Sequence, residues 1–284
     1  MLDTKKYIED ADLAGALLDN AQSNGGRLSP EDIVFGLKNI LKLKYYPVAV
    51  KFFYSSREIS ETLDGVDYKT GLRPFTFCHY LAASRQRGDI LFGGPEKIGC
   101  SNASYVLGWK ELNEREVDKH LKYTKDRAQA KRFLLTKTRM ESGLLGFASA
   151  PLHLAPYEPD VIHGICDPLQ AYYLANDWCA AFDIHPFEMW MTMNSSVCHG
   201  CVHAYRSGKP NITLMCSGSR TAGKTEQGEV NYIFPGRQLE TSFHWTLERI
   251  VRDGSAAYSR QAEPFPGPDI CKLCPFLVFT SPKK

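Results

Sequence analysis

Pro47-Val48-Ala49-Val50-Lys51-Phe52-Phe53 is the stretch that decides the fold. A short run of apolar, β-branched and aromatic residues after a proline is typical of a buried strand. Further strands are expected at residues 89–92, 160–165, 211–215 and 229–234. Segments with helical spacing separate these strands irregularly. The sequence therefore predicts an α+β (mixed α/β) fold, with short sheets flanked by helices.

Helices are expected on both sides of these strands. Ser29-Pro30-Glu31-Asp32 is typical of a helix start, because a hydroxyl caps it, proline fits its first position and acids suit its first turn. The predicted helices cover residues 5–20, 29–41, 77–87, 100–107, two stretches within 112–140, 168–181, 195–205 and 236–251. We expect a helical N-terminal extension over 1–43, an α+β domain over 44–252 and a proline-rich tail over 253–284.

The composition is that of an ordinary globular protein. The chain has 284 residues, 43% hydrophobic and 23% charged, with a net charge of +2. This balance gives no reason to expect nucleic acid as a partner. Neither a signal-peptide pattern at the N-terminus nor a membrane-spanning apolar segment is present in the sequence. The expected location is therefore the cytoplasm, where thiols stay reduced, with no membrane partner.

Nine cysteines carry most of the functional information. Four of them form two Cys-x-x-Cys pairs, Cys198 with Cys201 and Cys271 with Cys274. Three others, Cys78, Cys100 and Cys216, stand beside a predicted helix start or a turn-rich segment. Reduced thiolates in such settings are ligands for zinc or for iron–sulfur clusters. Cys166 and Cys179 lie in apolar surroundings, and we expect them to be core residues.

Two short segments resemble each other. Gly99-Cys100-Ser101 and Met215-Cys216-Ser217 share a cysteine followed by serine, and each cysteine follows another, by 22 residues in the first case and 18 in the second. This repetition suggests that two halves of the fold meet at a cysteine-lined site. Each half would deliver two thiolates to it.

Other chemistry for the cysteines remains open at this point. The two Cys-x-x-Cys pairs together offer the four sulfurs of a zinc site, but about 70 residues separate them, well beyond the spacing of zinc ribbons. Cys198 and Cys201 at a helix start are also compatible with dithiol exchange. His199 and His203 are expected to be ordinary surface or capping residues.

Basic and hydroxyl residues near the cysteines suggest an anion site. Ser217, Ser219 and Arg220 belong to a loop that exposes backbone N–H groups and a guanidinium, which suits a carboxylate or phosphate. Lys51 interrupts the first strand. Its ammonium either reaches the surface or lies near a bound ligand.

The ordered motifs of the chain resemble the ArCR family, a family of domains of unknown function found mostly in anaerobic bacteria and archaea. The resemblance covers residues ~30–250 and is carried by Pro47–Phe52, Phe77-Cys78, Gly99-Cys100 with Gly108, Glu158–Val161, Cys198, Gly208–Asn211, Cys216–Arg220, and Glu229 with Pro235. It implies that Cys78, Cys100, Cys198 and Cys216 are the recurring cysteines. Cys201 occupies a position where the family usually has a small residue, yet the spacing leaves Cys198 and Cys201 as alternatives. Cys271 and Cys274 lie beyond the usual end.

These observations together predict a cytoplasmic iron–sulfur protein of anaerobic metabolism. One [4Fe–4S] cluster would be bound by Cys78, Cys100, Cys198 and Cys216. The protein would act in electron transfer or in reductive chemistry on a small molecule, which would make it an iron–sulfur oxidoreductase if it is an enzyme. Cys201, Cys271 and Cys274 would cap this site or hold a second cluster. The expected partner is a redox protein or a small anionic ligand, and a homo-oligomer is compatible with this role. The alternatives are a zinc-binding structural module and a thiol–disulfide or sulfur-transfer enzyme.

Overall fold

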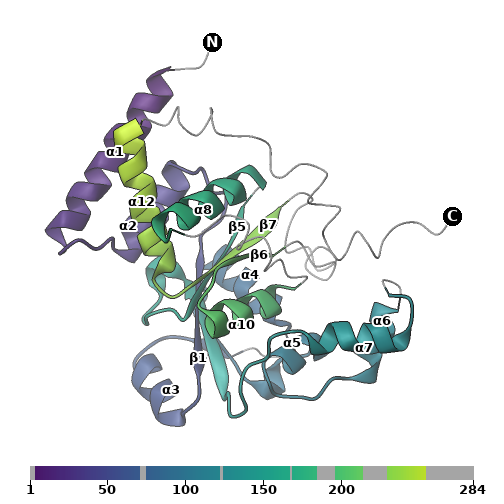
Figure 1. The fold of residues 1–284 in the computed structure, drawn as a ribbon. Helices are drawn as coiled ribbons and strands as arrows, with labels where there is room; N and C mark the ends of the chain where they lie inside the picture. Colours follow the sequence, from purple (N-terminus) through teal and green to yellow (C-terminus); the bar gives the residue numbers. More distant parts are fainter. Residues whose placement is uncertain are drawn as a thin grey trace.

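Seven strands of the described chain form one sheet around the segment that begins at Pro47 (Figure 1). The computed structural model describes residues 4–70, 75–121, 124–166, 168–183, 196–213 and 229–253. The spatial order of the strands is β2-β3-β4-β1-β5-β7-β6. They are β1 (Val48–Phe53), β2 (Lys69–Thr70), β3 (Leu91–Gly93), β4 (Gly146–Pro151), β5 (Val161–Cys166), β6 (Asn211–Thr213) and β7 (Val230–Pro235). The predicted mixed α/β class is confirmed, although the strands join a single sheet instead of several short ones.

Strand β1 lies in the middle of this sheet and is antiparallel to both of its neighbours. It pairs with β4 on one side and with β5 on the other. Of the strand pairs, only β2 with β3 is parallel among the described residues. Because successive side chains of a strand point to opposite faces, β1 supplies both layers of the core. Val50 and Phe52 enter one apolar cluster, and Ala49 and Phe53 enter the other.

Helices cover both faces of the sheet, as Figure 1 shows. We call the side covered by α4, α5 and α10 the cysteine face, and the side covered by α1, α2, α8 and α12 the terminal face. The helices of the cysteine face are α4 (Phe77–Arg87), α5 (Ser101–Val106) and α10 (Val197–Ser207). Those of the terminal face are α1 (Thr4–Ser23), α2 (Pro30–Asn39), α8 (Pro168–Ala181) and α12 (Gln238–Asp253). The remaining helices are α3 (Ser56–Leu63), α6 (Glu114–His120), α7 (Arg127–Leu135) and the short turns η1 (Pro95–Lys97) and η2 (Leu152–Leu154).

The predicted helical N-terminal segment is present and belongs to the same core as the rest. Ser29 caps α2 by accepting from the backbone N–H of Asp32, and the Asp32 carboxylate accepts from the backbone N–H of Ser29 in return. Leu17 of α1 and Leu37 of α2 share one apolar cluster with Phe243 of α12. The first 43 residues therefore complete the terminal face. The tail predicted over 253–284 lies outside the described residues, apart from Asp253.

Strand β4 is a central element that sequence patterns did not predict. Its sequence, Gly-Phe-Ala-Ser-Ala-Pro, is rich in small residues with low strand propensity, yet every residue of it is buried. It pairs with β1 and β3 and lies directly under α4. Ser149 shows why small residues suit this place, because its hydroxyl lies 2.9 Å from that of Ser84 on the helix. Packing between two strands and a helix therefore outweighs local propensity here.

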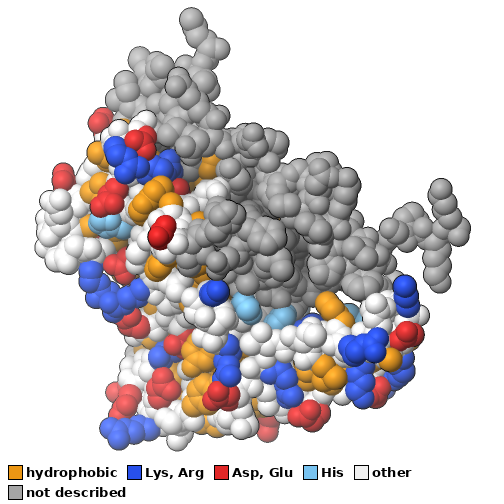
Figure 2. Space-filling model, viewed as in Figure 1, with side chains coloured by type: hydrophobic (Ala, Val, Ile, Leu, Met, Phe, Trp, Pro, Cys, Tyr) orange, Lys and Arg blue, Asp and Glu red, His pale blue; other side chains and the backbone are white. Residues whose placement is uncertain are grey.

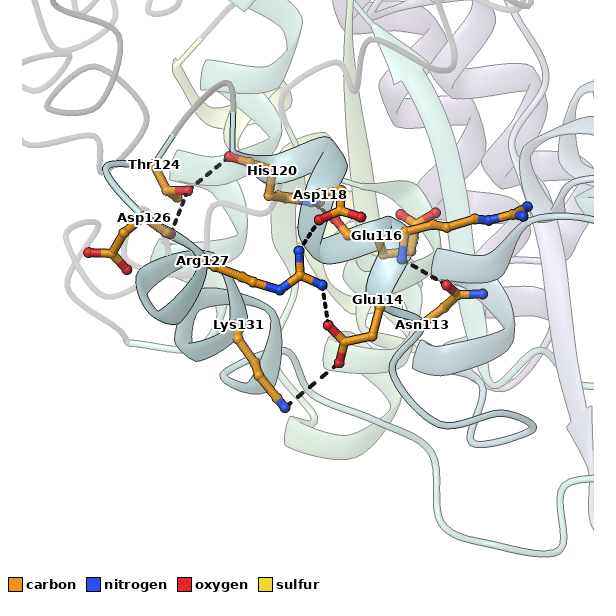
Figure 3. Close-up of polar contacts among 10 residues, drawn as sticks. Asn113, Glu114, Glu116, Asp118, His120, Thr124, Asp126, Arg127 and Lys131 are labelled. Carbon is orange, nitrogen blue, oxygen red and sulfur yellow. Dashed lines mark hydrogen bonds and ion pairs between the residues drawn. The ribbon is translucent and has the colours of Figure 1, made fainter.

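Helices α6 and α7 lie between α5 and β4 in the chain and form a separate hairpin. The sequence predicted two helices within residues 112–140. Val117, Ala130 and Leu134 form its small apolar core. On its outer side, Arg127 pairs with Glu114 and Asp118, and Lys131 also approaches Glu114 (Figure 3). Because these ion pairs are exposed, each contributes little to the free energy of unfolding, and their main effect is on how the two helices lie against each other.

The surface carries charges of both signs. On the face drawn in Figure 2, the described Lys and Arg side chains are interspersed with Asp and Glu. None of the described helices combines the length and the apolar composition that crossing a bilayer requires.

Candidate functional site

Three of the predicted ligands lie on the cysteine face, each at the start of a helix. Cys78 is in the first turn of α4, Cys100 is the N-cap residue of α5, and Cys198 is the second residue of α10. Cys198 belongs to the apolar cluster of this face, and Cys78 and Cys100 pack against it. Helix α10 contacts both α4 and α5. Segments that are far apart in sequence thus bring these cysteines into one layer.

The remaining predicted site residues fall outside the described part of the chain. They are Cys216, Ser217, Ser219 and Arg220 in 214–228, and Cys271 and Cys274 in 254–284. Within the described ranges, no three His, Cys, Asp or Glu side chains are grouped as ligands of a metal ion.

Polar groups surround the Cys198 sulfur in an otherwise apolar layer. The Nδ2 atom of Asn102 lies 3.3 Å from Cys198 Sγ and 3.4 Å from the Ser196 hydroxyl. On its other side, the Oδ1 atom of Asn102 accepts a hydrogen bond of 2.7 Å from the Lys137 ammonium. Both Cys198 and Lys137 are buried. Asn102 thus connects a buried cation to a buried sulfur.

Cys201 differs from Cys198 although the two share a Cys-x-x-Cys pair. It lies one turn further into α10 and is fully buried among apolar side chains. Burial raises the pKa of the Cys201 thiol well above its usual range, and the nearby Cys198 adds to this effect. Cys201 is therefore a protonated core thiol, whereas Cys198 has a donor beside its sulfur.

His199 is a buried hydrogen-bond acceptor, which corrects the expectation of a surface residue. Its Nε2 atom accepts from the backbone N–H of Thr138 at 2.8 Å. Burial, assisted by Lys137 and His203, lowers the pKa of His199 to about 3, so its ring is neutral at pH 7. This contact fastens the segment that carries Lys137 to α10.

Lys51 does not join the cysteines. Its neighbours at alternate positions of β1, Ala49 and Phe53, face the terminal side of the sheet, and Lys51 shares their direction. Its ammonium lies 3.2 Å from the carboxylate of Glu58 on α3. The first of the two interpretations, an ammonium that reaches toward the surface, fits this position. The second interpretation, an ammonium near a bound ligand, stays a prediction.

Arg85 is a buried cation on the cysteine face, and sequence patterns did not point to it. It lies two turns after Cys78 on α4, and only 5% of it is exposed. Its guanidinium packs over the ring of Tyr45, with 5.1 Å between the guanidinium carbon and the ring centre. Burial lowers the pKa of Arg85, while nearby acidic groups, including Cys78, oppose that shift. The described site thus contains two buried cations, Arg85 and Lys137.

The α6–α7 hairpin is tied to the residue that follows Cys100. Glu116 accepts hydrogen bonds from the Ser101 hydroxyl and from Lys119. Burial would raise the pKa of Glu116, but these two hydrogen bonds outweigh it and lower the pKa overall. The start of α5 is therefore fixed from the hairpin side as well as from α10.

Cys166 and Cys179 are core residues, as predicted. Each is 3% exposed and belongs to the apolar cluster of the terminal face. They lie on the opposite side of the sheet from Cys78 and Cys198.

Asn102, Lys137, Ser196 and Arg85 are the site residues that sequence reasoning missed. Asn102 stands two positions after Cys100, which is the one local signal that pointed to it. Lys137 is separated from Asn102 by 35 residues and sits in a segment that looks like a solvated helix end. Only the packing of the 136–140 segment against α10 places it in the interior.

Comparison with known proteins identifies the region that carries this site. A family model described as uncharacterised ArCR matches residues 36–243. An uncharacterised protein of Methanocaldococcus jannaschii is 27% identical over 202 residues, which cover 68% of this chain and 83% of the relative. No solved structure matches the chain. The matched region contains every described cysteine and Cys216.

Proposed function

The chain belongs to the uncharacterised ArCR family, and from the cysteines of the matched region we propose that it is an iron–sulfur protein of a reducing compartment. Its role would be electron transfer or reductive chemistry on a small molecule. The residues that would hold one [4Fe–4S] cluster are Cys78, Cys100, Cys198 and Cys216. The observation that carries the proposal is the placement of three of them at helix starts around one apolar layer.

The chemical surroundings of these sulfurs fit an anionic centre. The first turns of α4 and α10 direct backbone N–H groups and the positive end of a helix dipole toward Cys78 and Cys198. Arg85 and Lys137 add two buried positive charges. Buried cations favour negative charge in their surroundings, and four thiolates on a cluster would add such charge.

A cluster requires a wider spacing of its thiolates than a single metal ion does. A cubane binds each of its four thiolates through a different iron, so its ligands stand farther apart than those of a single ion. The lack of a close three-residue group in the described ranges is compatible with that arrangement. Cys78, Cys100 and Cys198 would then approach the centre from the starts of three different helices.

Cys216 is the proposed fourth ligand because it follows strand β6, which packs beside the helix that carries Cys198. Strand β6 ends at Thr213, and α10 packs against both β6 and β7. Cys216 follows Thr213 by three residues in the chain and lies outside the described residues. Cys198, with its Asn102 donor, is the better third ligand than the protonated Cys201.

When bound, such a cluster would accept or donate one electron at a time. The chain's own residues would set the polarity around it and exclude water through the apolar layer of the cysteine face. Ser217, Ser219 and Arg220 remain proposed contacts for a small anionic ligand, and Arg85, on the same helix as Cys78, is added to them as a buried cation. Cys271 and Cys274 remain proposed as accessory ligands.

A cysteine series tests the proposal. Protein purified without oxygen should lose most of its iron and visible absorbance in Cys78→Ala, Cys100→Ala, Cys198→Ala and Cys216→Ala. Cys166→Ala and Cys179→Ala are controls, because these thiols are buried as Cys198 is but lie on the terminal face. Circular dichroism would check that each variant folds. Retention of iron in all four ligand variants, or a colourless wild-type protein that holds zinc, would remove the proposal.

Dithiol chemistry is the second candidate, because Cys198 and Cys201 occupy the first turns of α10 with unequal surroundings. A thiol with a hydrogen-bond donor beside a buried, protonated partner is the arrangement of an attacking and a resolving cysteine. In that case Cys201→Ser would abolish disulfide exchange and leave the metal content unchanged. The iron–sulfur proposal expects Cys201→Ser to keep its iron and to have no such exchange to lose.

A further inference from the structure

The side chain of Asn102 stands between a buried ammonium and the Cys198 sulfur. We infer that Asn102 is a positioning residue for this sulfur and that Lys137 fixes the orientation in which it acts. The first observation is geometric. Nδ2 of Asn102 lies 3.3 Å from Sγ of Cys198, while Oδ1 of the same amide lies 2.7 Å from Nζ of Lys137.

Lys137 decides which end of the amide faces the sulfur. An ammonium can only donate hydrogen bonds, so the atom of Asn102 that meets it must be the carbonyl oxygen. The NH2 group is therefore forced to the opposite side, toward Cys198 and Ser196. Without the lysine, the amide could rotate and present its oxygen to the sulfur, which would repel a thiolate.

Burial gives this contact its strength. Lys137 is 6% exposed and Cys198 is 3% exposed, so water competes little for either group. In such surroundings a charge polarises the hydrogen bonds connected to it, and the Lys137 ammonium makes the amide N–H a better donor. The sulfur at the far end therefore gains stabilisation whenever it carries negative charge.

The surrounding contacts hold Cys198, Asn102 and Lys137 in place. Asn102 is in the first turn of α5, and Cys198 is in the first turn of α10. The segment with Lys137 is fastened to α10 by the hydrogen bond from Thr138 to His199. Three separate parts of the chain thus meet at one amide, which leaves it little freedom to turn.

The functional consequence rests on the proposed function, whereas the contact itself does not. A hydrogen bond to a ligand sulfur withdraws charge from it and favours the reduced form of the centre that it binds. Asn102 would therefore raise the reduction potential of a cluster held by Cys198. Asn102→Asp keeps the shape of the side chain but replaces its donor with a carboxylate, which separates this role from simple packing.

The test has one arm without metal and one arm with it. In the metal-free protein, the side-chain amide signals of Asn102 are followed by nuclear magnetic resonance in wild type, Cys198→Ala and Lys137→Met. We expect both substitutions to shift these signals, because each removes one of the two side chains that the Asn102 amide contacts. Unchanged signals in both variants would overturn the inference.

In the protein isolated without oxygen, the midpoint potential is measured for wild type, Asn102→Ala, Asn102→Asp and the control Ser101→Ala. Ser101 belongs to the same helical turn, but its hydroxyl bonds to Glu116 instead of the sulfur. We expect the two Asn102 variants to lower the potential, Asn102→Asp more strongly, and Ser101→Ala to leave it near the wild-type value. Equal shifts in all three variants would assign Asn102 a structural role and overturn the inference. A wild-type protein without iron would contradict the proposed function, and the metal-free arm alone would then decide whether Asn102 positions the sulfur.

Discussion

At the scale of single residues, the sequence predicted the position of some side chains in the fold and missed that of others. Cys78, Cys100 and Cys198 were singled out by helix-start and spacing patterns together with the resemblance to the ArCR family, and all three lie on one face of the sheet. For Lys51 the sequence left two positions open, because a charge within an apolar strand reveals nothing about which face of the sheet it occupies. Lys137 was missed for the opposite reason, since a lysine in a charged segment gives no sign of being buried.

His163 provides a pH-dependent prediction at the residue scale. Its Nε2 atom is hydrogen-bonded to Asn231, and no described residue bonds its buried Nδ1 atom. Burial, with a further contribution from Arg85, lowers the pKa of His163 from 6.5 to about 3. Between these two pKa values the imidazole is protonated in the unfolded chain and neutral in the folded protein. The contribution of His163 to the free energy of unfolding is therefore fully present above pH 6.5 and is lost as the pH falls toward 3.

Between pH 7 and pH 5 this one histidine should remove about 2 kcal/mol of unfolding free energy. His163→Gln, which keeps an amide near Asn231 but cannot titrate, should lose that much less over the same interval. Urea unfolding of both proteins at the two pH values measures the difference. An identical pH dependence in wild type and variant would show that His163 does not carry this effect.

At the scale of elements, close packing between helices can be tested with two glycines. Gly36 of α2 lies against α12, and a Cβ atom there would stand 2.4 Å from the Phe243 ring. Gly15 of α1 has no atom within 4 Å of the same position. Gly36→Ala should therefore cost about 1–3 kcal/mol through overpacking, and Gly15→Ala should gain about 0.5–1 kcal/mol through helix propensity.

Thermal or denaturant unfolding of the two glycine variants gives the comparison directly. Both substitutions add the same methyl group to a helix, so propensity alone would stabilise both. A stabilised Gly36→Ala protein would mean that α2 and α12 are farther apart than described here.

The α6–α7 hairpin offers a second prediction about an element. Leu134 is fully buried in the small core of the hairpin, while its neighbour Leu135 is 56% exposed. Leu134→Ala should destabilise the hairpin by about 2–3 kcal/mol, and Leu135→Ala should change it little. Amide hydrogen exchange of 114–135 measures this. Equal exchange in the two variants would contradict the packing.

The same scale shows where sequence reasoning about structure succeeds and fails. The capped start of α2 was predicted because Ser29, Pro30 and Asp32 each act within one turn. Strand β4 was missed because its small residues are selected by the helix above it and by the two strands beside it. Contacts between segments that are distant in the sequence stabilise such a strand, and no local sequence pattern predicts it.

At the scale of the whole molecule, the mixed α/β class followed from the order of strands and helices, but the sheet did not. Its order brings β1 to the centre, between β4 and β5, which are far along the chain. That arrangement divides the cysteines into two classes. Cys78, Cys100, Cys198 and Cys201 lie on the cysteine face, while Cys166 and Cys179 fill the terminal face. The proposed centre depends on this division more than on any one cysteine pair.

The central claim is that the cysteine face holds an iron–sulfur cluster. The most direct measurement is the iron and acid-labile sulfide content of the full chain purified without oxygen. A single [4Fe–4S] cluster predicts about four iron and about four sulfide per chain. Stoichiometric zinc without sulfide, or a folded protein without metal, would contradict the claim.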